Sequence, residues 1–170
     1  DDMREQQRAI SDVLRAVARS EGIQPVLEEV IEAGERLCRA DYGALYLLEH
    51  GLLHVVASHT STESVEWDRR HPHALDRTTG AGRAAVTREP VHIPDIRDDP
   101  EYSYGGPTYY RSLVAVPILV EDNLIGVVVA SRREPQPFTS QHIALVQTFA
   151  DQAAIAVANA RLMEAVERQR

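Results

Sequence analysis

The sequence has few of the features that mark secreted, membrane-spanning or nucleic-acid-binding proteins. Cys38 is the only cysteine in 170 residues, which excludes an intramolecular disulfide and predicts a reducing compartment, the cytoplasm. The longest uninterrupted apolar run, Leu113–Val120, is far shorter than the roughly 20 residues of a membrane-spanning helix. Basic residues number 18 against 26 acidic ones and form no cluster, so neither nucleic acid nor a membrane is an expected partner.

The N-terminal residues give two further expectations. No signal peptide is visible at the N-terminus. The first residue is Asp1 rather than methionine, so we expect this chain to be a segment of a longer protein.

Two apolar runs lie within residues 111–132, RSLVAVPILVEDNLIGVVVASR, and a short polar turn joins them. Both runs are rich in β-branched residues. Neither alternates between polar and apolar side chains, as a strand with one solvent-exposed face does. We therefore predict a hairpin that turns at residues 121–123 and lies in the middle of a sheet, with both of its faces covered.

The rest of the chain predicts the helices and the remaining strands. Apolar residues at helical spacing, glycines at helix ends and pairs of turn residues mark the boundaries. The expected elements are a helix that ends before Gly22, a second helix from about Pro25, a hairpin with strands 43–49 and 52–58, an irregular segment 60–79, a short helix from Gly80, a short strand near 90–95 and a long loop before the central hairpin.

The last expected element is one helix from Thr139 to about Arg168, with Thr139 or Ser140 as its N-cap. Its 30 residues would span about 45 Å at 1.5 Å per residue. Apolar residues on two of its sides indicate two packing partners. One is the sheet, and the other is the N-terminal helix or a second copy of the chain.

These elements predict an α/β fold of the α+β type. A central antiparallel sheet of five or six strands would carry the long terminal helices on one face, and short helices and loops on the other. We expect the loop-rich layer to leave a cavity against the sheet.

Three stretches of this sequence resemble the GAF domain family: RLCRADYGALYLLE, REPVHIPDI and the block from Tyr110 to Leu162. The similarity covers about residues 24–165, and it is to GAF modules of bacterial histidine kinases and nucleotide cyclases. The resemblance implies a non-enzymatic sensor of a small molecule. It also implies that residues 1–22 form a signalling and dimerisation helix, that 23–160 form the sensor domain and that 161–170 lead toward an output domain in the same protein.

Two motifs have weak sequence context. GAGRAA, Gly80–Ala85, matches a dinucleotide fingerprint, but no strand precedes it as that fingerprint requires. A helix start eased by glycine explains it better, and unpaired N–H groups at Gly80–Gly82 leave an anion site open there. His71 and His73 have a spacing that can hold a metal, yet no further ligands can be named. We predict no metal, and a haem held by a histidine stays an alternative that the resemblance allows.

Other chemistry known for GAF domains departs from this sequence. Cyclic-nucleotide-binding members carry Asn-Lys, then Phe, then Asp-Glu, where this chain has Ser131-Arg132, Phe138 and His142-Ile143. Cyclic GMP is therefore not expected, and Phe138 is expected in the core. Cys38 lies on the apolar face of a predicted helix, so we expect it to be a core residue and not a bilin attachment point. The methionine-sulfoxide-reducing members need more than one cysteine, and no catalytic dyad is visible.

The candidate binding site follows from where the aromatic residues fall. The only tryptophan and four of the six tyrosines lie in irregular segments, where they add little to a regular core. Rings with polar tips suit mixed apolar and polar cavities. We predict a pocket between the sheet and residues 60–110, lined by Trp67, His71, His73, His92, Tyr102, Tyr104, Tyr109, Tyr110 and Arg111.

The chain ends predict a homodimer. The apolar stripe of the N-terminal helix is narrow, and an isolated helix of that length is marginal in water. Burial against a second copy would involve Ile10, Leu14, Val17, Met163 and Val166. Two alternatives to the sensor remain: a ligand-free dimerisation and linker domain, and a haem- or metal-binding sensor.

Overall fold

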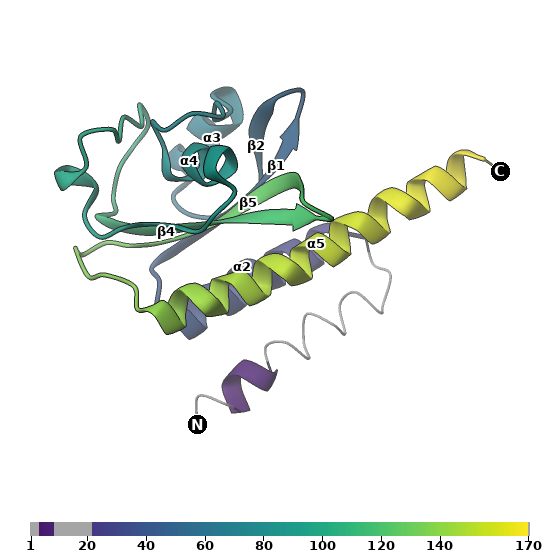
Figure 1. Cartoon of the computed structure of the whole chain (residues 1–170), viewed down its shortest axis with the longest axis horizontal. Helices are drawn as coiled ribbons and strands as arrows, with labels where there is room; N and C mark the ends of the chain where they lie inside the picture. Colours follow the sequence, from purple (N-terminus) through teal and green to yellow (C-terminus); the bar gives the residue numbers. More distant parts are fainter. Residues whose placement is uncertain (1–3, 9–21, 170) are drawn as a thin grey trace.

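The computed structural model describes residues 4–8 and 22–169, which include a central sheet with helices on both faces (Figure 1). Five antiparallel strands pair in the order β2-β1-β5-β4-β3, which confirms the predicted α+β fold. Residues 4–8 are helical. The other elements are α2 Gln24–Cys38, β1 Tyr42–Glu49, β2 Leu52–His59, α3 Thr62–Arg70, α4 Gly80–Thr87, β3 Val91–Ile93, the 3₁₀ helix η1 Ile96–Asp98, β4 Ser112–Val120, β5 Asn123–Arg132 and α5 Ser140–Arg168.

The central hairpin of β4 and β5 is buried on both faces, as its apolar runs predict. Val114, Val116 and Ile118 of β4 point to the side of α2 and α5. Leu113 and Ala115, which alternate with them, point to the side of α4. Each strand face therefore meets a different layer, and no face of this hairpin needs polar residues.

Tight turns close both hairpins at the expected positions. His50 and Gly51 join β1 to β2 with φ values of 52° and 78°, and Glu121 and Asp122 join β4 to β5 with φ values of 49° and 67°. Positive φ at both central residues is the geometry whose twist matches that of antiparallel strands.

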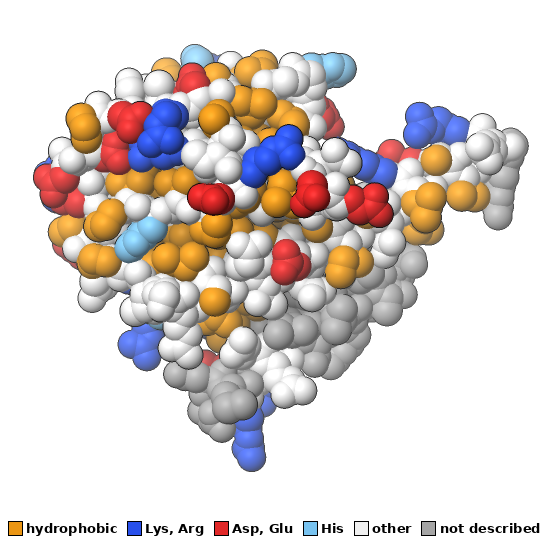
Figure 2. Space-filling view, in the orientation of Figure 1, with side chains coloured by type: hydrophobic (Ala, Val, Ile, Leu, Met, Phe, Trp, Pro, Cys, Tyr) orange, Lys and Arg blue, Asp and Glu red, His pale blue; other side chains and the backbone are white. Residues whose placement is uncertain are grey.

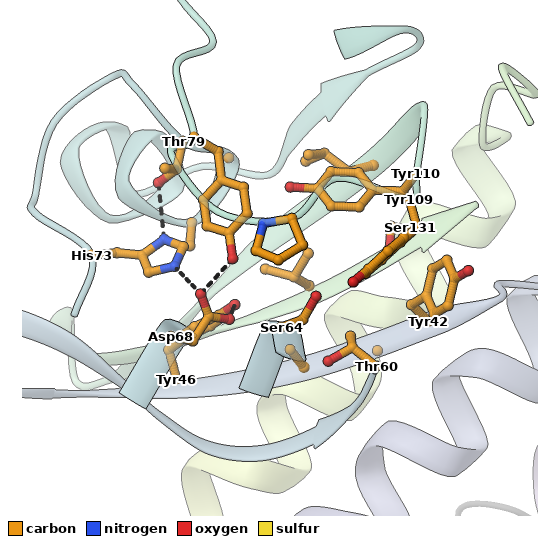
Figure 3. Close-up of a pocket in the computed structure, with 18 of the residues that line it drawn as sticks. Tyr42, Tyr46, Thr60, Ser64, Asp68, His73, Thr79, Tyr109, Tyr110 and Ser131 are labelled. Atoms are coloured by element: carbon orange, nitrogen blue, oxygen red, sulfur yellow. Dashed lines mark hydrogen bonds and ion pairs between the residues drawn. The ribbon is translucent and has the colours of Figure 1, made fainter. Parts of the chain in front are cut away.

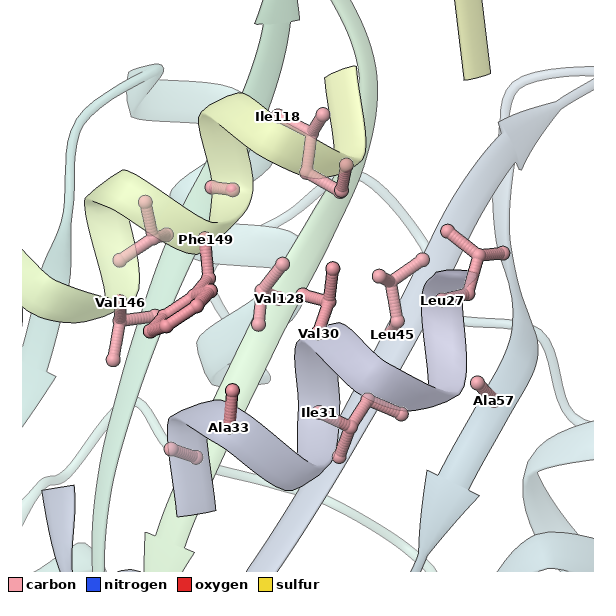
Figure 4. Packing of buried hydrophobic residues seen from close by; sticks show 14 of the residues in the cluster. Leu27, Val30, Ile31, Ala33, Leu45, Ala57, Ile118, Val128, Val146 and Phe149 are labelled. Carbon is pink, nitrogen blue, oxygen red and sulfur yellow. The ribbon is translucent and has the colours of Figure 1, made fainter. Parts of the chain in front are cut away.

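Helices α2 and α5 pack side by side on the sheet and form the larger core (Figure 4). Phe149 of α5 and Val30 of α2 are fully buried there, together with Val116 of β4. Cys38 and Phe138 belong to the same cluster and are 0% and 4% exposed, so both are core residues as expected.

Residues 60–79 are not irregular throughout, as the sequence analysis expected, because α3 occupies Thr62–Arg70. Its N-cap is Ser61, whose hydroxyl accepts a hydrogen bond from the Ser64 amide. The two side chains that α3 buries are polar, Ser64 and Asp68. The helix therefore has no apolar stripe that would reveal it in the sequence.

Helix α5 begins at Ser140 with Thr139 as its N-cap, in agreement with the prediction. Its C-terminal part extends past the sheet (Figure 1), and Leu162, Met163 and Val166 are exposed there. Figure 2 shows apolar side chains on this projecting end. Ile10, Leu14 and Val17, the other predicted dimer residues, lie outside the described residues.

Within the part of the chain that the structure describes, α5 alone is long and apolar enough to cross a membrane. This is weak evidence of a membrane span, because a core helix of a globular domain passes the same test. The first half of α5 is such a core helix, packed against α2 and the sheet.

Candidate functional site

A cavity of about 60 Å³ lies on the face of the sheet opposite α2 and α5. The strands β1 and β5 form its floor, α3 and α4 form its sides, and residues 99–110, which we call the strap, close it. All six tyrosines of the chain line this cavity, two from β1 and four from the strap. The residues that line it are Tyr42, Gly43, Ala44, Tyr46, Thr60, Ser64, Asp68, His73, Thr79, Gly80, Ala81, Tyr102, Tyr104, Pro107, Tyr109, Tyr110, Leu113, Val129 and Ser131.

The Asp68 carboxylate is the centre of a buried polar network in this cavity (Figure 3). Its Oδ1 accepts hydrogen bonds from Tyr104 Oη at 2.8 Å and His73 Nε2 at 3.2 Å. Its Oδ2 accepts one from Tyr46 Oη at 3.0 Å. Asp68 is only 6% exposed, and a buried carboxylate needs such donors to offset the loss of hydration.

His73 connects Asp68 to the start of α4. Its Nε2 bonds to the carboxylate, and its Nδ1 forms a hydrogen bond of 3.2 Å with the Thr79 hydroxyl. The same hydroxyl oxygen is the N-cap of α4 and accepts a hydrogen bond from the Gly82 amide at 3.0 Å. A change at Asp68 is therefore linked through one imidazole to the first turn of α4.

Four of the cavity tyrosines remain protonated near neutral pH, because burial raises the pKa of their hydroxyl groups. Burial, reinforced by the Asp68 charge, raises the pKa of Tyr46 well above its usual value. Burial likewise raises the pKa of Tyr102, Tyr104 and Tyr110. Tyr102 and Tyr110 also contact each other through their hydroxyl groups. These four phenols thus act as neutral hydrogen-bonding groups rather than as acids or nucleophiles.

Side-chain contacts at several points hold the strap in place. Arg83 of α4 is 6% exposed and forms a two-pronged ion pair with Asp99, at 2.8 and 3.1 Å. The Ser103 amide donates to the Thr78 carbonyl oxygen at 2.7 Å, and Tyr109 Oη donates to Glu63 of α3 at 3.1 Å. The strap therefore bridges α3 and α4 above the cavity.

Five of the nine predicted site residues line this cavity: His73, Tyr102, Tyr104, Tyr109 and Tyr110. They come from the strap and from the segment between α3 and α4. For these five residues the structure agrees with the prediction that polar-tipped rings from irregular segments lie at one cavity. That they bind a ligand stays a prediction.

The other four predicted residues do not line it. Trp67 and His71 stack on each other, with ring centroids 3.7 Å apart. On α3 it is Asp68, the residue after Trp67, that is buried toward the cavity. His92 alternates on β3 with Ile93, which faces the cavity layer. It therefore points to the other side, where Nε2 accepts a hydrogen bond from the Phe138 amide at 3.1 Å. Arg111 forms an ion pair with Asp95 at 2.6 Å.

Sequence reasoning missed several cavity residues that lie on regular elements. Tyr42 and Tyr46 alternate along β1, and this spacing could have placed both on one sheet face. Ser64 and Asp68 are four residues apart on α3 and so share a helix face. The polar lining residues that were missed are Tyr42, Tyr46, Thr60, Ser64, Asp68, Thr79 and Ser131.

Three positions of the cyclic-nucleotide motif lie together on the far side of the sheet. The Arg132 guanidinium stacks 4.1 Å above the Phe138 ring centroid, and its Nη2 donates to His142 Nδ1 at 3.3 Å. Burial and the Arg132 charge lower the pKa of His142. These residues pack α2 and α5 against β5 and do not reach the cavity.

A metal or thiol centre has little support in this geometry. Among residues 4–8 and 22–169, no three His, Cys, Asp or Glu side chains are placed to hold a metal. Burial raises the pKa of Cys38 to about 11, so its thiol stays protonated and unreactive near neutral pH. With the strap in this position the cavity, at about 60 Å³, is smaller than the roughly 300–1,000 Å³ typical of ligand sites.

Comparison with known proteins agrees with this architecture. A model of the GAF domain matches residues 22–157, and the chain therefore belongs to the GAF domain family.

Similar solved structures include a GAF domain of a phosphoenolpyruvate-protein phosphotransferase from Coxiella burnetii, with TM-score 0.81 and 19% identity over 97% of this chain and 99% of that one. Free methionine-R-sulfoxide reductase from Neisseria meningitidis gives TM-score 0.78 and 14% identity over 93% and 91%. A GAF domain/HD domain protein from Geobacter sulfurreducens gives 0.73 and 19% over 82% and 94%. Several neighbours are thus signalling-type proteins, and at these identities the likeness shows a shared fold.

Proposed function

We propose that this chain is the small-molecule-sensing GAF module of a larger, cytoplasmic bacterial signalling protein of the histidine kinase or nucleotide cyclase type. One observation carries the proposal: a cavity built around the buried Asp68–His73 pair lies on the opposite face of the sheet from α2 and α5. A ligand at one face can thereby act on helices at the other. The module itself has no catalytic role in this proposal.

The end of β5 supports a route from the cavity to the helices. Ser131 lines the cavity. Arg132, the next residue, points to the opposite face, where it donates hydrogen bonds to the carbonyl oxygens of Cys38 at the end of α2 and of Pro137 before α5. A shift of the β5 end on ligand binding would move both helix ends together, which is the scale of movement that switches use.

The closed cavity sets a condition on ligand entry. About 60 Å³ corresponds to roughly four to six water molecules at about 10–15 Å³ each. A larger ligand enters only if the strap moves away from α3 and α4. The contacts of the strap are mostly made by side chains, such as Arg83 with Asp99 and Tyr104 with Asp68, so it can separate without breaking the sheet.

The small cavity also favours a second candidate, a dimerisation and linker domain that binds no ligand. In both candidates the chain forms a homodimer through its terminal helices, and the C-terminal end of α5 leads to an output domain. Met163 and Val166 support this, because they are 58% and 49% exposed beyond the sheet.

An enzymatic role has weaker support. A sulfoxide reductase shares the fold, but this chain has one cysteine, and its thiol is buried with a raised pKa. Thiol chemistry needs an accessible thiolate, which Cys38 does not provide.

A ligand screen distinguishes the two candidates. We expect at least one compound of a metabolite panel to stabilise the purified chain against heat, by about 2.7 kcal/mol at a hundred times its dissociation constant. Asp68→Asn, which removes the cavity charge, should abolish that stabilisation. Asp98→Asn at an exposed position should retain it. If no compound stabilises the chain and it still dimerises, the linker domain is the correct function.

A further inference from the structure

The first turn of α4 presents two unused hydrogen-bond donors to the cavity. Thr79 caps the Gly82 amide, but the amides of Gly80 and Ala81 donate no hydrogen bond to any described residue. Both residues are buried and line the cavity. Because buried backbone amides rarely lack a partner, we expect an acceptor inside the cavity to bind these two amides.

A second, independent donor lies on the cavity floor. Ser131 of β5 is 6% exposed, and its hydroxyl forms no hydrogen bond with the described residues. It lines the cavity together with Val129, two positions earlier on the same strand face. Figure 3 shows Ser131 at the cavity, beyond the Asp68–His73 pair.

The packing of Gly80 brings these donors near each other. A Cβ at Gly80 would overlap Leu113 Cδ1, so the missing side chain lets the start of α4 pack directly on β4. Leu113 pairs in register with Ser131. The Gly80 backbone and the Ser131 hydroxyl therefore lie over neighbouring positions of the same sheet.

We infer that the cavity binds a small monocarboxylate, whose carboxylate accepts hydrogen bonds from the Gly80 and Ala81 amides and the Ser131 hydroxyl. Unpaired amides at a helix start, together with the positive end of the helix dipole, favour a negative oxygen ligand. The inference rests on the proposed sensing function and names the class of ligand for the same cavity.

The Asp68 carboxylate in the same cavity opposes an anion, so the ligand must be separated from it. His73 lies between Asp68 and Thr79, with one ring nitrogen toward each (Figure 3). The ring therefore keeps the Asp68 carboxylate apart from the first turn of α4. Asp68 also has two tyrosine donors, which spread its charge away from the α4 side.

The remaining lining limits the ligand to a short aliphatic acid. Ala44, Ala81, Leu113 and Val129 give the cavity apolar walls. Its volume, about 60 Å³, holds about four to six heavy atoms while the strap is closed, since one water needs about 10–15 Å³ of such space. An acid of about two to four carbons matches both the apolar walls and this size.

Titration of the ¹⁵N-labelled chain 1–170 with sodium propionate tests the inference. We expect saturable shifts of the Gly80 and Ala81 amide resonances. Ser131→Ala should weaken propionate binding about tenfold, since hydrogen bonds to charged groups are stronger than neutral ones. Ser140→Ala, at an exposed serine outside the cavity, should leave the dissociation constant unchanged.

Two isosteric probes test the charge of the ligand. Propionamide lacks the negative charge, and propylammonium carries a positive one, so both should bind at least tenfold more weakly than propionate. Equal or tighter binding of either probe would overturn the carboxylate. Shifts that do not saturate, or a Ser131→Ala variant that binds like the unchanged chain, would overturn the site. If the carboxylate or the site is overturned in this way, the sensing function is still supported when a compound of the metabolite panel stabilises the chain and Asp68→Asn abolishes that effect.

Discussion

Arg132 Nη2 donates a hydrogen bond of 2.6 Å to the carbonyl oxygen of Cys38, which lies 94 residues earlier in the chain. The other guanidinium nitrogens reach the carbonyl oxygens of Arg39, Gln136 and Pro137. One side chain at the end of β5 therefore fixes the C-terminal end of α2 and the segment that leads into α5.

Replacing Arg132 should destabilise the domain strongly. In Arg132→Lys a single ammonium cannot reach all the acceptors around the edge of the planar guanidinium, and buried carbonyl groups lose their donors. We expect a loss of about 2–4 kcal/mol in the free energy of unfolding, measured with urea. Arg69→Lys, at an exposed position of α3, is the control. Equal stability of the two variants would contradict this role for Arg132.

Two histidines beside Arg132 should make the domain less stable in weak acid. Burial and the Arg132 charge lower the pKa of both His92 and His142 from 6.5. The folded state therefore favours the neutral rings, in which His92 Nε2 and His142 Nδ1 accept backbone hydrogen bonds. Their contribution to stability is complete above about pH 6.5 and is lost as the pH falls through the lowered pKa values.

NMR titration of the ring protons measures this directly. Both midpoints should lie below 6.5 in the folded chain and return to about 6.5 in urea. A folded-state midpoint above the value in urea would reverse the predicted direction.

Breaking the Arg83–Asp99 ion pair should release the strap from α4. Arg83→Gln leaves Asp99 without its two-pronged partner, so we expect a loss of about 1.5–3 kcal/mol in stability. Amide hydrogen exchange should become faster across residues 99–110. Arg77→Gln is a matched control, because the Arg77–Glu101 pair is about half exposed on both sides and contributes little. Similar exchange rates in both variants would show that Arg83 does not hold the strap.

The sequence predicts most of the sheet, because its strands are marked by local signals. β-branched runs without alternation indicate the buried β4–β5 hairpin, and turn residues such as His50–Gly51 indicate where strands reverse. Helix α5 is equally visible, since its cap and its helically spaced apolar residues, without Pro or Gly, need no tertiary information.

The cavity is harder to predict because its centre is polar. Asp68 and Ser64 are buried by α3, whereas a sequence pattern assigns such residues to solvent. His73 is predicted only as one more polar-tipped ring in a segment expected to be irregular. Trp67 is wrongly predicted to line the cavity, because composition does not tell which side of α3 faces the sheet. Which of these residues meet depends on the path of the strap, and no local pattern encodes that path.

The exposed end of α5 should mediate self-association. Met163 and Val166 are 58% and 49% exposed, and burial of apolar surface contributes roughly 25 cal/mol per Å². The double variant Met163→Gln/Val166→Gln should therefore shift the chain from dimer to monomer in sedimentation equilibrium, with the domain still folded. Arg161→Gln/Glu167→Gln changes two polar residues of the same segment and should leave the dimer intact. A Met163→Gln/Val166→Gln variant that still sediments as a dimer, or an unchanged chain that stays monomeric at high concentration, would exclude this interface.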